Sequence, residues 1–151
     1  MRILGLDIGT KTIGVAISDP LGFTAQGLTT WRRRGLAADL QAMHEFINDY
    51  GVEEVLIGLP LNMNGSRGPA VALAEQFASE LSQALAGRLK AQPVKITLRD
   101  ERLSTRAAER TLLEGDVSRR NRKRVIDKMA AVFILQGYLD YLRNHPEGCK
   151  Q

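Results

Sequence analysis

The chain has 151 residues, of which 44% are hydrophobic and 25% are charged, and these values are typical of one globular domain with a single core. Its net charge of +4 is compatible with a nucleic-acid partner, and its single cysteine excludes an internal disulfide and a cysteine-rich metal cluster. No run reaches the ~18 apolar residues of a membrane helix, and Asp7 interrupts the first apolar run too early for a signal peptide, so we expect a soluble, cytoplasmic protein with no membrane partner.

Residues 1–19 are predicted to form a β-hairpin. Two runs with the alternating period of a strand flank a Gly-Thr-Lys-Thr connection at 9–12. Asp7 lies near the turn end of the first, otherwise apolar strand. Burying a carboxylate costs free energy unless a cation compensates it. Asp7 is therefore the first candidate for a metal or phosphate site.

The rest of the chain predicts strands that alternate with helices. Turn residues at 20–22 precede a weak third strand, and Gly51, Pro60 and Pro93 separate later elements. The expected order is a strand at 23–31, a helix at 36–50, a strand at 55–59, a helix at 70–89 opened by Pro69, a strand at 94–98, and helices at 106–114 and 125–142. This order predicts an α/β fold, with a mixed sheet that is antiparallel at one side, parallel at the other, and covered by helices on both faces. We expect one domain over residues 1–144 and a flexible tail at 145–151.

Three acids lie on, or directly after, otherwise apolar elements: Asp7, Glu101 and Asp127. Ligand sites in α/β sheets gather at the carboxyl ends of parallel strands, where Asp7 and Glu101 are expected, and a helix that crosses there would add Asp127. Carboxylates brought together raise one another's pKa unless cations neutralise them. Mg²⁺ and Mn²⁺ prefer oxygen ligands, and two such ions would bind both the attacking water and the leaving oxygen of a phosphodiester.

Each acid also has a simpler structural explanation. Asp7 would cap a turn, although its apolar setting favours a functional role. Glu101 would pair at the surface with Arg99 or Arg102, and the sequence leaves these two explanations even. Asp127 would be an acid favoured by the helix dipole, which spacing alone favours. Three further acids are more easily explained as turn residues: Asp19, Asp100 and Asp116.

The basic residues fit a polyanionic substrate. Lys11 lies in the first turn and Arg67 in a glycine-containing loop, while the arginines at 32–34 are simpler to explain as a solvated loop than as a phosphate-contacting edge. A basic run that we expect to form a link directly precedes Asp127, and this placement favours nucleic acid over mere solvation. Few aromatic residues accompany the cations, so base stacking is not indicated. The candidate contacts are Lys11, Arg67, Arg102, Arg106, Arg119, Arg120, Arg122, Lys123 and Arg124.

Four motifs resemble one known family over nearly the whole chain. They are GLDIGTKTIGVAISDP at 5–20, VLIGLPLNMNGSRG at 55–68, DERLST at 100–105 and IDKMAAVFILQGYLD at 126–140. In this order they resemble the YqgF/RuvX family, the pre-16S rRNA nucleases that are also described as Holliday-junction-resolvase-like. The resemblance implies a ribonuclease-H-like fold with a five-stranded mixed sheet, in which strand two is antiparallel to the others. It also implies that Asp7, Glu101 and Asp127 are the catalytic, metal-binding acids, with one or two Mg²⁺ or Mn²⁺ ions.

The leading functional hypothesis is a metal-dependent endonuclease for structured RNA, which by resemblance matures the 5′ end of 16S rRNA, with ribosomal particles as further partners. The same acids also suit a resolvase of four-way DNA junctions, which needs a dimer for two symmetric cuts, so both a monomer and a homodimer remain open. A third hypothesis is half of a sugar-kinase or actin-like ATPase, because Asp-Ile-Gly-Thr also binds phosphate there, but this chain lacks a second lobe. A fourth is a non-catalytic RNA-binding factor of ribosome assembly.

Overall fold

The computed structural model describes residues 2–61, 64–87, 93–100 and 119–144, and for 119–128 it describes the backbone alone. The predicted helix at 106–114 and the tail at 145–151 lie outside the described residues, so the expected domain limits stay a prediction. The described elements are β1 (Arg2–Ile8), β2 (Thr12–Ser18), β3 (Ala25–Arg32), α1 (Leu36–Tyr50), β4 (Val52–Leu59), α2 (Pro69–Ala86), β5 (Lys95–Asp100) and α4 (Arg119–Asn144).

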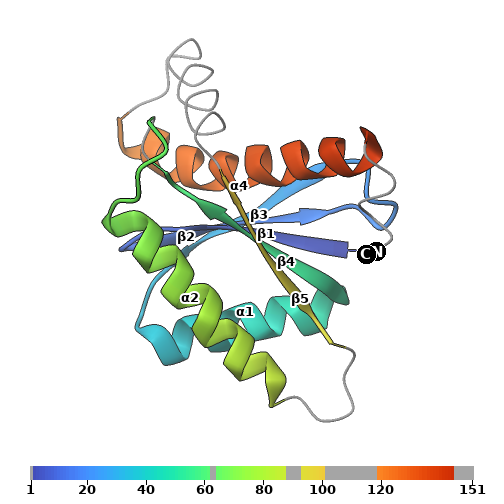
Figure 1. The fold of residues 1–151 in the computed structure, drawn as a ribbon, viewed down its shortest axis with the longest axis horizontal. Helices are drawn as coiled ribbons and strands as arrows, with labels where there is room; N and C mark the ends of the chain where they lie inside the picture. The colour runs from blue at the N-terminus through green and yellow to red at the C-terminus, as the bar shows by residue number, and fades with distance from the viewer. Residues whose placement is uncertain (1, 62–63, 88–92, 101–118, 145–151) are drawn as a thin grey trace.

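The strands form one mixed sheet in the order β3-β2-β1-β4-β5 (Figure 1). β2 pairs antiparallel with both β1 and β3, whereas β1 with β4 and β4 with β5 pair parallel. The prediction that strand two runs opposite to the other four is confirmed. Because β1, β4 and β5 run in the same direction, their carboxyl ends lie along one edge of the sheet.

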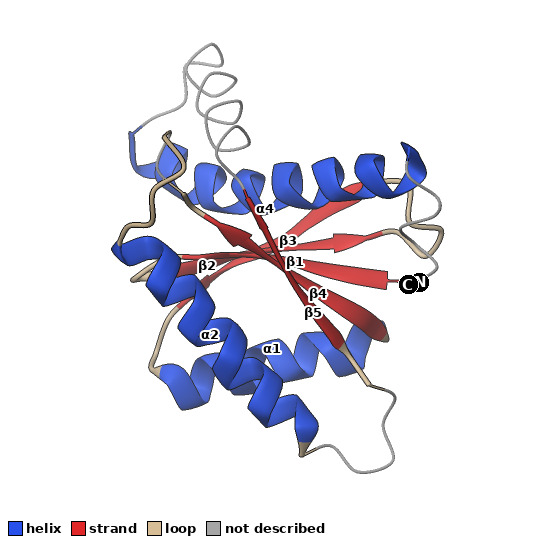
Figure 2. Cartoon of the chain, in the orientation of Figure 1, coloured by secondary structure: helices blue, strands red, loops and turns tan. Residues whose placement is uncertain are grey.

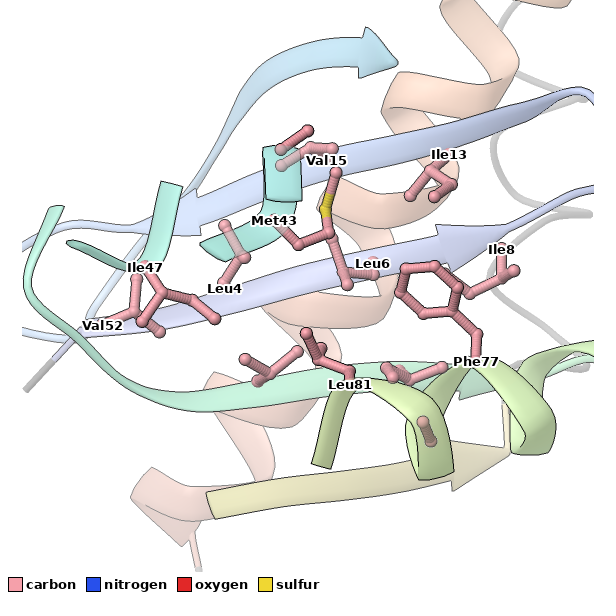
Figure 3. Packing of buried hydrophobic residues seen from close by; sticks show 14 of the residues in the cluster. Leu4, Leu6, Ile8, Ile13, Val15, Met43, Ile47, Val52, Phe77 and Leu81 are labelled. Atoms are coloured by element: carbon pink, nitrogen blue, oxygen red, sulfur yellow. The ribbon is translucent and has the colours of Figure 1, made fainter. Parts of the chain in front are cut away.

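Helices cover both faces of the sheet, with α1 and α2 on one face and α4 on the other (Figure 2). Alternation along β1 directs Leu4 and Leu6 into a core with Met43 of α1 and Phe77 of α2 (Figure 3). The intervening Ile3 belongs to a second core formed with α4. Full burial of one such side chain contributes about 1.5–3 kcal/mol, so the period-2 pattern fixes which face each residue occupies.

Two element boundaries differ from the prediction in ways that concern the site. The last helix begins at Arg119, so the basic run at 119–124 is helical and not a link. Arg and Lys are strong helix formers, and no Gly or Pro interrupts this run. β4 begins at Val52, three residues before the predicted start. Glu54 therefore lies within the strand, and it is buried there. None of the helices in the described part of the chain has the length and apolar character to cross a membrane.

Candidate functional site

Asp7 is the penultimate residue of β1, at the edge where the carboxyl ends of the parallel strands lie. It is partly buried and lies opposite Gly14 of β2. It follows Ile3 and Gly5 in the alternation of the strand, so it lies on the face that α4 covers. The hairpin therefore places a carboxylate between an apolar layer and the edge of the sheet, as predicted.

Gly5 and Gly9 lie two residues before and after Asp7. At each of them another part of the chain comes too close to leave room for a Cβ atom. A Cβ at Gly5 would lie 3.0 Å from Leu135 Cβ and 3.4 Å from the carbonyl oxygen of Ala131, so Gly5 lets α4 pack directly on β1. A Cβ at Gly9 would lie 2.9 Å from the carbonyl oxygen of Thr12, to which the Gly9 N–H donates a hydrogen bond of 2.8 Å. The connection from β1 to β2 is therefore tight, and Asp7 sits on a rigid segment.

Asp127 lies in α4, one helical turn before Ala131, whose carbonyl oxygen packs near Gly5. The start of α4 lies on the same side of the molecule as the turn between β1 and β2, and its end lies beside the start of β1 (Figure 1). α4 thus runs antiparallel to β1. The basic run occupies the first turns of α4, ahead of Asp127: Arg119, Arg120, Arg122, Lys123 and Arg124.

Glu101, Arg102 and Arg106 lie outside the described residues. β5 ends at Asp100, directly before Glu101, and its carboxyl end lies along the same sheet edge as that of β1. In the described part of the chain, no three His, Cys, Asp or Glu side chains form a metal-binding group. Of the three predicted acids, Asp7 has a described side chain, so the joint placement of the three stays a prediction.

Two predicted phosphate contacts are described in full. Lys11 is exposed in the connection after β1. Arg67 is also exposed, and its guanidinium pairs with the carboxylate of Glu75 in α2. An exposed ion pair contributes roughly 0–1 kcal/mol, so Arg67 would exchange this partner for a phosphate at small cost.

The other acids considered from the sequence have different positions. Asp19 accepts hydrogen bonds from the backbone N–H groups of Phe23 (2.7 Å) and Thr24 (3.4 Å), which confirms it as a turn residue. Slight desolvation acts to raise the pKa of Asp19, but these hydrogen bonds outweigh it and lower the pKa below 3.8. Asp100 was expected in a turn but is the last residue of β5, and Asp116 lies outside the described residues.

Arg33 and Asp39 are site-related residues that the sequence analysis missed. Arg33 was expected in a solvated loop, yet its side chain is only 15% exposed, because its Nε donates to Asp39 Oδ2 at 2.8 Å. The buried Asp39 also accepts from Trp31 Nε1 (2.9 Å) and from the Arg34 backbone N–H (3.0 Å). Burial acts to raise the pKa of Asp39, but these hydrogen bonds and the charge of Arg33 outweigh it, so the pKa lies below 3.8. An acid in the first turn of a helix, shortly after three arginines, was the available signal.

Glu54 is a second buried acid that the sequence analysis missed. It is 5% exposed and accepts hydrogen bonds from Thr97 Oγ1 (2.8 Å) and Tyr138 Oη (2.6 Å). In the strand register Glu54 lies opposite Ile3 of β1 and Lys95 of β5. These positions are near the amino ends of the strands, away from the edge that carries Asp7. Glu54 therefore connects β4, β5 and α4, and its surroundings indicate a structural role.

Comparisons with known proteins agree with this geometry. A family model described as "RuvX: Holliday junction resolvase" matches residues 1–141. A protein of Moorella thermoacetica named "Putative pre-16S rRNA nuclease" is 61% identical, with 94% of this chain and 96% of that protein covered. A protein of Myxococcus xanthus with the same name is 56% identical, with 93% and 88% covered.

Solved structures share the fold at low sequence identity. Fowlpox virus resolvase, in complex with Holliday junction DNA, matches with a TM-score of 0.58 at 12% identity, over 94% of this chain and 99% of that chain. Thermus thermophilus RuvC, in complex with a Holliday junction substrate, matches with a TM-score of 0.54 at 13% identity, over 89% and 91%. These matches confirm the ribonuclease-H-like fold. The family match over residues 1–141 and the two close relatives show that this chain belongs to the RuvX family, a family of nucleases.

Proposed function

We propose that this chain is a metal-dependent endonuclease that hydrolyses phosphodiester bonds in structured RNA, acts in the cytoplasm, and has the precursor of 16S rRNA as its substrate. The observation that carries the proposal is the position of Asp7, a partly buried carboxylate at the carboxyl end of the central strand β1, on the face covered by α4. The name shared by the close relatives supports RNA as the substrate class.

The packing of α4 on β1 supports Asp127 as the partner of Asp7. Gly5 packs near Ala131. Two residues along a strand advance about 6.6 Å, and four residues along a helix advance about 6 Å. Because α4 runs antiparallel to β1, the step from Gly5 to Asp7 corresponds to the step from Ala131 to position 127. We assign Asp7 and Asp127 to opposite sides of one site on this basis.

The alternation of β5 supports Glu101 as the third acid. Thr97 lies on the α4 face because it donates to Glu54, and Arg99 lies there because its guanidinium is 5.7 Å from the ring centroid of Tyr138. An extension of this alternation by one residue past Asp100 would put position 101 on the same face, at the edge that carries Asp7. Three carboxylates from β1, the end of β5 and α4 would then converge from distant parts of the sequence.

The donor chemistry fits Mg²⁺ or Mn²⁺. Carboxylate oxygens are hard ligands, and Asp7 lies in an otherwise apolar layer where a cation would offset its desolvation. When bound, such an ion supplies charge neutralisation at the phosphate and activation of the attacking water. In this proposal Asp7 is the central ligand, and Glu101 and Asp127 complete the set, with one or two ions bound.

Basic residues around this edge would bind the substrate backbone. Lys11 is exposed in the turn next to Asp7, and the run at 119–124 occupies the first turns of α4. Each phosphate contact releases counterions, so we expect RNA affinity to fall steeply with salt and the slope to become shallower when the run is changed to alanine. Arg67, Arg102 and Arg106 are the remaining candidates.

A four-way DNA junction is the second candidate substrate, and the description of the family model favours it. The two substrates can be compared directly with precursor 16S RNA and a synthetic junction, each with Mg²⁺ and with Mn²⁺. Selective cutting of the RNA supports the proposal. Selective cutting of the junction, by a protein that light scattering shows to be a dimer, would refute it in favour of a junction resolvase.

The decisive variant is Asp7→Asn, with Asp19→Asn as the matched control in the turn between β2 and β3. We expect Asp7→Asn to bind RNA and lose cleavage, while Asp19→Asn cleaves like the wild type. Full cleavage by Asp7→Asn in a nuclease-free preparation would refute the mechanism. A non-catalytic assembly factor would show the reverse pattern, in which alanines at 119–124 abolish function in cells and Asp7→Asn does not.

A further inference from the structure

We propose that Arg33 is a positioning residue for the site, and that the Arg33–Asp39 pair holds the connection at 9–11 in the conformation that aims Asp7. This inference rests on the proposed nuclease function. It concerns two residues that lie on the α1 and α2 side of the sheet and would not contact the substrate or a metal ion.

Arg33 joins the connection to two helices, α1 and α2. Its Nη1 donates to the carbonyl oxygen of Gly9 at 3.0 Å, and its backbone N–H donates to the carbonyl oxygen of Lys11 at 2.8 Å. Its Nε donates to Asp39 in α1, and its guanidinium lies 5.5 Å from the ring centroid of Phe77 in α2. Gly9 follows Asp7 by two residues, so Arg33 holds the connection in which the Asp7 strand ends, while the pairing of Asp7 with Gly14 sets the face on which Asp7 lies.

Asp39 cannot turn away from Arg33 without losing other hydrogen bonds. Its Oδ1 accepts from Trp31 and from the backbone N–H of Arg34, and its side chain is fully buried. The carboxylate therefore fixes the guanidinium, and the guanidinium fixes Gly9. A surface ion pair contributes little to order because both side chains remain mobile, whereas here the carboxylate is fully buried and the guanidinium is only 15% exposed.

Arginine is needed at this position because two atoms in different directions are used. Nε bonds Asp39 while Nη1 reaches Gly9, and the planar guanidinium holds these donors at a fixed angle. A lysine has one terminal nitrogen, which would keep the charge next to Asp39 but lose the bond to Gly9. Arg33→Lys thus separates the positioning role from the charge that a buried carboxylate requires.

The test compares Arg33→Lys with Arg34→Lys. Arg34 is the exposed neighbour, and its backbone N–H bonds Asp39 whatever its side chain. We expect Arg33→Lys to cleave about 10–100-fold more slowly at saturating RNA, with RNA affinity unchanged and the thermal midpoint lowered by the lost bond to Gly9. Arg34→Lys should match the wild type in all three measurements.

Hydrogen exchange gives a readout that a general loss of stability would not produce. In Arg33→Lys, amides at 9–12 should exchange faster, while amides of β4 keep their wild-type protection. Wild-type cleavage by Arg33→Lys, or faster exchange throughout the sheet, overturns the positioning role. If the wild-type protein fails to cleave RNA, the proposed function itself is refuted, an outcome distinct from an active wild type with an equally active Arg33→Lys.

Discussion

The face of the sheet under α4 has an acid near each end, and the two acids differ in how deeply they are buried. At the amino end, Glu54 is 5% exposed and accepts from the hydroxyl groups of Thr97 and Tyr138. At the carboxyl end, Asp7 is only partly buried, between two glycines and next to an exposed lysine. The first acid is enclosed by groups of the fold, whereas the second is partly exposed at the carboxyl end of β1.

This difference shows that a carboxylate on an apolar strand does not by itself indicate a site. A buried polar group is compatible with stability once hydrogen bonds compensate its desolvation, and Glu54 has such bonds from two elements. What distinguishes Asp7 is its place at the carboxyl ends of parallel strands, where ligands bind in α/β sheets. Three changes test this comparison, and a fourth, Asp39→Asn, tests the ion pair on the opposite face of the sheet.

Asp7→Asn should have the largest effect. A metal ligand contributes more than the groups that orient it, so we expect cleavage to fall by more than about 100-fold, with the protein still folded. Cleavage rates at saturating RNA and the thermal midpoint measure the two effects separately. A loss of cleavage that merely follows a loss of folded protein would contradict the proposed role.

Asp39→Asn should have the second largest effect, which is a loss of stability. Removing one partner of a buried ion pair leaves the other uncompensated, and we expect the free energy of unfolding to fall by about 3 kcal/mol. Asp49→Asn, an exposed change in the same helix, should leave it unchanged. Denaturant unfolding measures both variants.

The cost of Asp39→Asn should also depend on pH. The folded-state pKa of Asp39 is lowered from 3.8, so its contribution is complete above the unfolded pKa and is lost as the pH falls through the folded one. The stability difference between wild type and variant should therefore be constant above about pH 4 and shrink below it. A difference that grows on acidification would contradict this sign.

Tyr138→Phe should reduce stability without reducing cleavage. The change removes one of two donors to Glu54, and we expect a loss of about 2 kcal/mol. Tyr50→Phe is the matched control, because it keeps the aromatic ring that faces Arg2. It should change the free energy of unfolding little. If Tyr138→Phe abolishes cleavage in a folded protein, Glu54 belongs to the site and the comparison fails.

Gly5→Ala should have the smallest effect. Gly5 lies in β1 between the two ends of the face that α4 covers. The added Cβ would meet Leu135 Cβ at 3.0 Å, so α4 must shift and the cost should be about 1–2 kcal/mol. Gly137→Ala, in α4, meets no atom within 4 Å and should stabilise the protein by about 1 kcal/mol through helix propensity. Equal effects of the two changes would show that α4 does not pack closely on β1.

The architecture could be predicted from the sequence because the spacing of apolar residues follows which face of each strand or helix is buried. The hairpin, the amphipathic α1 and the buried β4 follow from apolar spacing, and the Gly-Thr-Lys-Thr connection puts Asp7 near the turn end of its strand, where the structure has it. Charge was the weaker guide. The charge pattern predicts a link at 119–124 and a strand that begins after Glu54, and both predictions are wrong. Side-chain charge says little about backbone structure when helix propensity or a specific hydrogen-bond donor decides it.

The Arg33–Asp39 pair shows why the contacts around the proposed site could not be predicted. Arg33 follows the end of β3 and Asp39 begins α1, and only the fold brings the guanidinium to the carbonyl oxygen of Gly9. Such a contact depends on tertiary structure and has no period or motif. The assignment of Glu101 and Asp127 came from resemblance, since spacing alone favoured a dipole-related acid at 127.

The position of the first strand has a consequence for biosynthesis. β1 lies in the middle of the sheet, yet β4, β5 and α4, which complete its surroundings, come later, and α4 is the last of the described elements. Contacts between opposite ends of a chain, such as Gly5 with Leu135, form late in folding. A nascent chain would therefore hold Asp7 without its covering helix until residues 119–144 have left the ribosome. The proposed site would then be complete only after α4 has packed on the sheet.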